Sequence, residues 1–162
     1  MKQQTPAFQF IKEIYQTSPD AIALISGNDN NPSLSGIVSF YQSAYVGLLI
    51  EAEIFGLPYN TSSVPTEFYA MHIHQFGNCT PPFDQTGEHY NPENLPHPQH
   101  AGDLLPLLGN LGYAWSVFYD ERLTLDEIIG KSVIIHRNPD DFATQPSGNA
   151  GDKIGCGQIR WR

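Results

Sequence analysis

Histidine is the residue type in this chain that most clearly indicates a chemical function. Two of the six histidines, His72 and His74, are separated by one residue in a stretch with the pattern of a β-strand. Because alternate side chains of a strand share a face, both imidazoles should point the same way. Two imidazoles on one rigid strand make half of a transition-metal site. The other four histidines lie in or beside polar segments: His89, His97, His100 and His136.

A second group of potential ligands lies in the run from His97 to Asp103. It places two imidazoles and a carboxylate at three-residue intervals, at His97, His100 and Asp103. Prolines in this segment exclude a regular helix. With one further ligand, the run could hold a tetrahedral cation. Imidazole and carboxylate without thiolate suit zinc, copper, iron or nickel better than calcium or magnesium, and the spacing alone leaves the choice open.

The composition indicates one domain built mostly of strands. With 162 residues, 40% of them apolar, the chain can bury one sizeable core, so we expect a single domain over residues 1–162. Only 15% of the residues are charged, whereas 14 are glycine and 13 are proline. This balance favours short strands and turns over long helices. The expected fold class is therefore all-β.

The charge and the hydropathy pattern exclude several kinds of partner. A formal net charge of −9 argues against nucleic acid and against an anionic membrane, since both attract clustered lysine and arginine. No stretch approaches the roughly 18 consecutive apolar residues of a membrane span. The first residues contain no apolar segment of a secretory signal, so we expect a cytoplasmic protein. A secreted or periplasmic location stays open, because a start that replaces a removed leader would look the same.

Hydrophobic periodicity predicts one helix followed by strands. Residues 5–17 carry an apolar helical face that begins with Pro6 at the first helical position and ends before Pro19. Residues 123–130 fit either a helical turn or a short strand. Strand patterns occur at residues 21–26, 36–43, 48–55, 67–76, 112–119, 131–137 and 156–161.

The segments between these strands include two long polar loops, at residues 77–112 and 138–151. Loops of this length in compact domains are usually functional or disordered. About eight strands would close into a sandwich or barrel, because closure leaves no exposed edges. We therefore expect a β-barrel over residues 21–162, preceded by a helical extension over residues 1–20. The barrel has to position the loops that carry most of the potential ligands.

The chain contains two cysteines, Cys79 and Cys156. Their spacing suggests neither a zinc knuckle nor a CxxC redox pair. They are either two thiols or one long-range disulfide. A reducing intracellular compartment would favour the thiols.

Several short motifs follow one another along the chain in an order and spacing that are highly specific. They are Gly56-Leu57-Pro58, His72-Ile73-His74, Gly87-Glu88-His89-Tyr90-Asn91-Pro92, His97, His100-Ala101-Gly102-Asp103-Leu104, Val133-Ile134-Ile135-His136, Asp140-Asp141, and Gly148-Asn149-Ala150-Gly151 followed by Cys156-Gly157. This pattern resembles the copper–zinc superoxide dismutase family from about Ala21 to Ile159. The segment around His97 and the position of Cys79 look more like bacterial members than animal ones.

The resemblance implies an eight-stranded antiparallel Greek-key β-barrel with a copper site and a zinc site that share one histidine. The copper ligands it implies are His72, His74, His89 and His136. The zinc ligands it implies are His89, His97, His100 and Asp103. All seven ligand positions of the family are filled in this chain.

The resemblance also implies residues that support these sites. Asp140 matches a carboxylate that hydrogen-bonds one histidine of each site, here His72 and His97. Loss of such a partner typically costs about 10- to 100-fold in metal affinity or activity. Cys79 and Cys156 match the family disulfide.

The activity that the resemblance implies is the conversion of superoxide to dioxygen and hydrogen peroxide by redox cycling of copper. Catalytic roles fall to His89, which exchanges a proton, and to Lys153, which stands where the family usually has arginine. Lys153 keeps the positive charge for a small-anion substrate but lacks the planar fork of donors, so we expect a slower enzyme. The family also implies a homodimer, although the contact face and the role of the N-terminal helix stay open.

Two other functions fit part of the pattern. A non-enzymatic, dismutase-like metal-binding protein would keep zinc for structure and would lack copper or buffer it. Loss of a copper ligand would be its signature, and no ligand is lost here. A zinc hydrolase would need an open coordination position, which His97, His100 and Asp103 provide only if His89 lies elsewhere.

Overall fold

The structure, a computed structural model, describes residues 5–59 and 66–162. The first four residues of the predicted N-terminal extension lie outside the described residues. The helices are α1 (Pro6–Gln16), the 3-10 helix η1 (Asp84–Thr86) and α2 (Leu125–Ile128). The strands are β1 (Ala21–Gly27), β2 (Ser35–Gln42), β3 (Leu48–Phe55), β4 (Thr66–Tyr69), β5 (Met71–His74), β6 (Leu107–Asn110), β7 (Tyr113–Asp120), β8 (Ser132–His136) and β9 (Lys153–Trp161).

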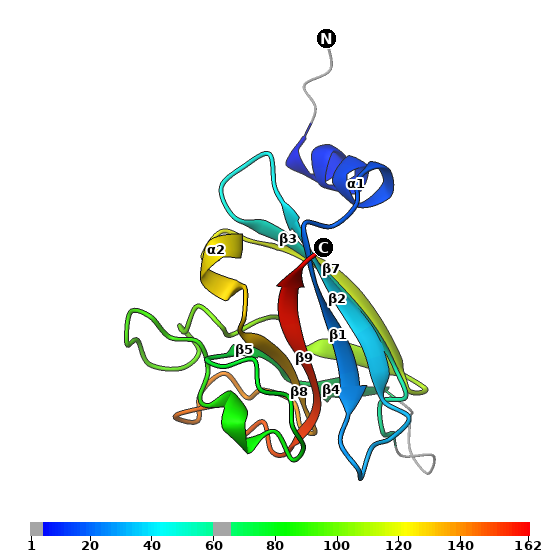
Figure 1. Ribbon diagram of the computed structural model, residues 1–162, viewed down its shortest axis with the longest axis vertical. Coiled ribbons are helices and arrows are strands. Elements are labelled where there is room, and N and C mark those ends of the chain that lie inside the picture. The colour runs from blue at the N-terminus through cyan, green and yellow to red at the C-terminus, as the bar shows by residue number, and fades with distance from the viewer. Residues whose placement is uncertain (1–4, 60–65) are drawn as a thin grey trace.

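The strands form one antiparallel sheet in the order β4-β6-β7-β3-β2-β1-β9-β8-β5. Its two outer strands, β4 and β5, follow each other in the chain with Ala70 alone between them. The sheet therefore curls back on itself into a nearly closed barrel (Figure 1). The predicted all-β barrel with an N-terminal helix is confirmed, with nine strands in the described part of the chain where about eight are expected.

Two local features account for the difference in the strands. The strand predicted from residue 67 is divided at Ala70, because β4 pairs with β6 whereas β5 pairs with β8. Strand β6 lies within residues 77–112, for which the sequence predicts only a loop. Gly109 and Asn110 disfavour a strand by propensity. The strand forms nevertheless because pairing with β4 places Leu107 opposite Tyr69, and both side chains are fully buried.

The segment at residues 123–130, which the sequence leaves undecided, contains the helical turn α2. Thr124 and Glu127 form a capping box, in which the Thr124 N–H donates to the Glu127 carboxylate at 3.2 Å. Leu125 and Ile128 are buried in the main core. A reciprocal cap and two apolar anchors therefore stabilise a helical turn here.

Alternate side chains of the strands fill the barrel. On β1, Ala21, Ala23 and Ile25 are buried, whereas Leu24 between them is 65% exposed, as the period of two requires. Buried residues of the other strands extend the same cluster, among them Val38, Phe40, Ile50, Ala52, Met71, Ile73, Val133 and Ile135. The interior of the barrel is an apolar core, so the polar chemistry has to lie on its outside.

Helix α1 lies at one end of the molecule, and η1 with its loop lies toward the opposite end (Figure 1). Phe10 of α1 stacks on Tyr119 of β7 with ring centroids 5.0 Å apart. The buried Glu13 accepts a hydrogen bond from the Ala44 N–H at 3.2 Å. The predicted helix is confirmed as an element packed on the barrel. The single domain expected over residues 1–162 stays a prediction.

No helix in residues 5–59 and 66–162 is long and apolar enough to span a membrane.

Candidate metal centre

Strands β5 and β8 bring three histidines together on the barrel wall. Met71 and Ile73 of β5 belong to the core, so His72 and His74 point to the other side of the sheet, as their spacing predicts. Strand β8 pairs with β5 and ends at His136. The Nε2 atoms of His74 and His136 are 3.3 Å apart. Half of a metal site is therefore built from regular sheet.

The loop that follows β5 supplies further ligands by pairing with the free edge of that strand. An outermost strand leaves a row of backbone donors and acceptors without a strand partner. Ile73 donates one backbone hydrogen bond to this loop at 2.9 Å and accepts one at 2.7 Å. Two isolated antiparallel β-bridges result, with His89 opposite His74 and Asp103 opposite His72. Backbone pairing thus fixes where the loop presents its ligands.

Four buried imidazoles form the first cluster: His72, His74, His89 and His136. One ring nitrogen of each lies within 4.8 Å of the others. Tetrahedral nitrogen ligands at 2.0–2.1 Å from a metal are about 3.3 Å apart. The separation between His74 and His136 matches this spacing. The first cluster therefore suits one transition-metal ion with four nitrogen ligands.

Hydrogen bonds fix the second ring nitrogen of three of these histidines. The acceptors are the Asp140 carboxylate for His72 Nε2–H (2.7 Å), the Gly87 carbonyl for His74 Nδ1–H (2.8 Å) and the Gly151 carbonyl for His136 Nδ1–H (3.1 Å). A nitrogen that donates its hydrogen fixes the tautomer, so the lone pair lies on the opposite nitrogen. The lone pairs of all three rings are consequently available to the cluster.

Three histidines and one carboxylate form the second cluster: His89, His97, His100 and Asp103, all buried. The Nδ1 atoms of His89 and His97 lie 2.7 and 3.0 Å from the two oxygens of Asp103. His100 Nδ1 is 3.4 Å from His89 Nδ1. Three nitrogens and one oxygen around a common point are a typical ligand set for tetrahedral zinc.

Buried ring nitrogens without hydrogen bonds test whether these clusters fit metals. His72 Nδ1, His89 Nε2 and His97 Nδ1 are buried and make no hydrogen bond; His97 Nδ1 lies near Asp103, but their relative orientation is not that of a hydrogen bond. Burying a polar atom without a partner is costly. A metal ion at each cluster would satisfy all three atoms. The two clusters are therefore suited to binding copper and zinc.

Asp140 connects the two clusters from the second polar loop. Its carboxylate accepts from His72 Nε2–H at 2.7 Å and from His97 Nε2–H at 2.9 Å. Burial opposes ionisation, but hydrogen bonds from His72, the Phe142 N–H and His97 hold the pKa of Asp140 well below its usual range. Gly148 makes the close approach possible, because a Cβ there would overlap the Asp140 carboxylate and lie 2.7 Å from His97 Nε2. Asp140 thus hydrogen-bonds one histidine of each cluster.

The metal-free protein should lose stability as the pH falls below about 6.5. Burial, and then the neighbouring His72, lower the pKa of His136 to about 3, and burial likewise lowers the pKa of His74. Between pH 6.5 and about 3 the unfolded chain therefore binds more protons than the folded chain. The free energy of unfolding consequently decreases as the pH is lowered through this range. Urea unfolding of chelator-treated protein at pH 7.5, 6.0 and 5.0 measures this.

The interval above pH 5 isolates the histidines, because carboxylates protonate in the unfolded chain near pH 4. His136→Gln is the matched variant and should show a smaller loss between pH 7.5 and 5.0. An equal urea midpoint for the original protein at all three pH values would contradict the prediction.

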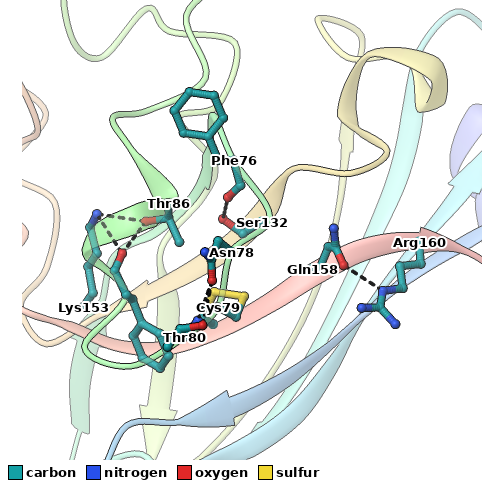
Figure 2. Close-up of a disulfide and its surroundings, with 11 residues drawn as sticks. Phe76, Asn78, Cys79, Thr80, Thr86, Ser132, Lys153, Gln158 and Arg160 are labelled. Atoms are coloured by element: carbon teal, nitrogen blue, oxygen red, sulfur yellow. Dashed lines mark hydrogen bonds between the residues drawn. A yellow bond between two sulfur atoms is a disulfide. The ribbon is translucent and has the colours of Figure 1, made fainter.

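The predicted disulfide between Cys79 and Cys156 is present, with a Cα–Cα distance of 5.5 Å. It ties the loop after β5 to strand β9. Figure 2 shows Lys153, at the start of β9, reaching the same loop beside the disulfide. Lys153 Nζ donates to Thr86 Oγ1 at 2.9 Å and to the Gly87 carbonyl at 3.1 Å.

The carbonyl of Gly87 therefore accepts two hydrogen bonds, one from Lys153 Nζ and one from His74 Nδ1–H. Burial lowers the pKa of Lys153, while Glu88 and Asp84 act in the opposite direction. The charge of Lys153 in turn helps to lower the pKa values of His74 and His136. Lys153 thus contacts the backbone that orients the first cluster, whereas the sequence suggests only a charge for the substrate.

Arg122 is a residue beside the second cluster that sequence reasoning missed. Its guanidinium donates to the backbone carbonyls of His100 and Asp103 at 3.0 and 2.7 Å. Neither periodicity nor a ligand motif marks this position. The only signal is an arginine two residues after an acidic residue at the end of a predicted strand.

These features define a β-barrel with two histidine-rich clusters that share one residue, and the comparisons with known proteins identify the class. The family model for copper/zinc superoxide dismutase (SODC) matches residues 34–159. The chain therefore belongs to the copper/zinc superoxide dismutase family.

Individual relatives include both enzymes and other proteins. The chain is 34% identical over 155 residues to Cu-Zn superoxide dismutase 3 of Arabidopsis thaliana, which covers 86% of this chain and 88% of that protein. It spans about half the length of other curated relatives, such as the copper chaperone for superoxide dismutase of Sus scrofa, with 30% identity over 158 residues, 90% of this chain and 54% of that protein. Among solved structures, a double mutant of a SOD-like protein from Bacillus subtilis is similar with a TM-score of 0.75 and 28% identity, over 86% of this chain and 96% of that chain.

Proposed function

We propose that this protein is a superoxide dismutase with copper at the first cluster and zinc at the second. The observation that carries the proposal is that His89 belongs to both clusters. Its Nδ1 faces the second cluster, 2.7 Å from Asp103, while its Nε2 is buried without a hydrogen bond. One imidazole has two ring nitrogens, so it can serve two metals at once. Two independent metal sites would not need a shared ring, so its presence supports a paired copper and zinc centre.

Copper, when bound, would take one electron from a first superoxide, releasing dioxygen, and return it to a second, which with two protons becomes hydrogen peroxide. Zinc has no redox chemistry and would be held by His89, His97, His100 and Asp103. His89 Nε2 is the atom at which this chain can hold a proton between the two half-reactions. Burial keeps His74 and His136 neutral by lowering their pKa values, and neutral imidazole is the form that binds metals.

Access for an anion depends on local charge, because the chain as a whole carries −9. Lys153 is the cation that contacts Gly87, whose carbonyl orients His74. A positive charge at this point attracts a small anion from solution and makes the association rate depend on ionic strength. We therefore assign Lys153 two roles, attraction of superoxide and orientation of the loop.

Replacing Lys153 by alanine should lower the second-order rate constant about tenfold and weaken its dependence on ionic strength. Pulse radiolysis at several salt concentrations, with metal content measured for each sample, provides the test. Lys153→Arg should retain most of the rate because it keeps the charge. Thr86→Val removes one acceptor of Lys153 without changing any charge, so it should leave the salt dependence unchanged. An unchanged rate and an unchanged salt dependence in Lys153→Ala would remove Lys153 from the attraction of substrate.

The second candidate is a non-enzymatic metal-binding protein of the same fold. The similarity of the chain to a copper chaperone and to a SOD-like protein supports this candidate. It would bind zinc at the second cluster and show no turnover with copper at the first. Measuring superoxide consumption at known copper occupancy separates the two functions.

We also infer a homodimer, which the family resemblance implies. Exposed apolar side chains on neighbouring strands, Leu24 of β1 and Trp161 of β9, support a contact between copies. Sedimentation of the purified protein measures its oligomeric state.

A further inference from the structure

The proposed function leaves unexplained a cation held against the second cluster. Arg122 lies two residues beyond the end of β7, and its side chain is 42% exposed. Nη1 donates to the His100 carbonyl at 3.0 Å, and Nη2 donates to the Asp103 carbonyl at 2.7 Å. Both acceptors belong to residues whose side chains form the second cluster. The guanidinium therefore contacts the backbone of two potential ligands without contacting the cluster itself.

The two carbonyls belong to one tight turn. The Asp103 N–H donates to the His100 carbonyl at 3.1 Å, and the His100 N–H donates to the Asp103 carboxylate at 3.0 Å. The turn directs His100 Nδ1 and the Asp103 carboxylate toward His89 and His97. Its carbonyl groups are the part that Arg122 binds. Rotation of this turn would move two ligands of the second cluster together.

Asp120 connects the guanidinium to the barrel. Its carboxylate accepts from Arg122 Nε at 3.1 Å, from Nη2 at 2.5 Å and from the Arg122 N–H at 2.8 Å. Asp120 is buried and is the last residue of β7, where it pairs with Leu48 of β3. The contacts thus run from a barrel strand through one ion pair to the turn that carries His100 and Asp103.

We propose that Arg122 is a positioning residue for the second cluster, holding the turn of His100 and Asp103 at the orientation that binds zinc. The inference rests on the proposed assignment of zinc to this cluster. A guanidinium suits the task because its donors form a planar fork, and four acceptor atoms surround it: two carbonyls and two carboxylate oxygens. A lysine ammonium is a point charge on a flexible stem and cannot reproduce this arrangement.

The test compares Arg122→Gln and Arg122→Lys with the original protein. Zinc affinity is measured by competition with a chromophoric chelator, and the geometry of the second cluster by the visible absorption of bound Co²⁺. We expect the zinc dissociation constant to rise about 10- to 100-fold in Arg122→Gln, the range typical for residues that orient metal ligands. The zinc dissociation constant of Arg122→Lys should lie between those of the original protein and Arg122→Gln. The Co²⁺ absorption bands should shift in the same order.

Three controls separate positioning from general stability. Arg160→Lys changes an arginine that pairs with Gln158, which belongs to neither cluster, and should leave zinc affinity unchanged. Copper affinity should stay close to the original value in the Arg122 variants. Asp120→Asn, which weakens the anchor without touching the turn, should raise the zinc dissociation constant in the same direction and serves if an Arg122 variant fails to fold.

Two results would overturn the inference. One is a zinc dissociation constant within twofold of the original in Arg122→Gln or in Asp120→Asn. The other is an equal loss of copper and zinc affinity, which would indicate a general structural role. Failure of the zinc assignment looks different, because the original protein itself would then bind neither Zn²⁺ nor Co²⁺ at the second cluster. Failure of the dismutase activity alone would leave zinc binding intact and abolish only turnover with copper.

Discussion

Replacing His89 by alanine should weaken the binding of both metals and lower dismutation by at least about 100-fold. His89 is the residue that the two clusters share. Its loss removes a nitrogen from each, whereas loss of a residue that only orients a ligand already costs about 10- to 100-fold. Copper and zinc affinities by chelator competition, together with turnover by pulse radiolysis, measure the effect.

Two matched variants show whether the shared position is responsible. His74→Ala removes a ligand from the first cluster only, and His100→Ala removes one from the second only. We expect His74→Ala to weaken copper and His100→Ala to weaken zinc, each with little effect on the other metal. If His89→Ala affected one metal only, the two clusters would not share this ring and the proposed bridge would be wrong.

Removing the disulfide should lower the free energy of unfolding by about 4 kcal/mol. Cys79 and Cys156 are 77 residues apart, and a crosslink over a loop of this size restricts the unfolded chain strongly. The double variant Cys79→Ser with Cys156→Ser avoids leaving a single thiol. Urea unfolding of the metal-free protein measures the difference, because bound metals would add their own stabilisation.

The disulfide should also influence the first cluster. It joins the loop that carries Gly87 to β9, which begins with Lys153. We therefore expect weaker copper binding in the double variant, in addition to the lower stability. Reduction of the original protein by dithiothreitol, with the reductant removed before measurement, is the matched treatment. It should produce the same loss of unfolding free energy and of copper affinity. Equal unfolding free energies for the oxidised protein and the double variant would contradict this account.

Regular elements of the site could be predicted because their signals are local. The alternation of His72 and His74 with apolar residues is sufficient to place both imidazoles on one face of a strand. The helix at residues 5–17 is marked by its apolar face and by Pro6. The motif resemblance adds the assignment of the ligands to two sites, the role of Asp140 and the disulfide, which no single segment reveals.

The parts that could not be predicted depend on contacts distant in the sequence. Strand β6 contains a glycine and an asparagine, and it forms between β4 and β7, both of which pair with it. The pairing of His89 and Asp103 with β5 arises because β5 is an edge strand, a property of the complete sheet. Arg122 acts through backbone carbonyls, which leave no side-chain pattern in the sequence.

The most direct test of the central claim combines metal analysis with turnover on the same purified sample. The protein is stripped of metal, loaded with one equivalent of zinc and titrated with copper while superoxide decay is followed by pulse radiolysis. We expect one copper and one zinc per chain, no turnover before copper is added, and a rate that rises in proportion to the copper bound. Full copper occupancy without turnover would contradict the proposed dismutase activity and favour a non-enzymatic metal-binding protein.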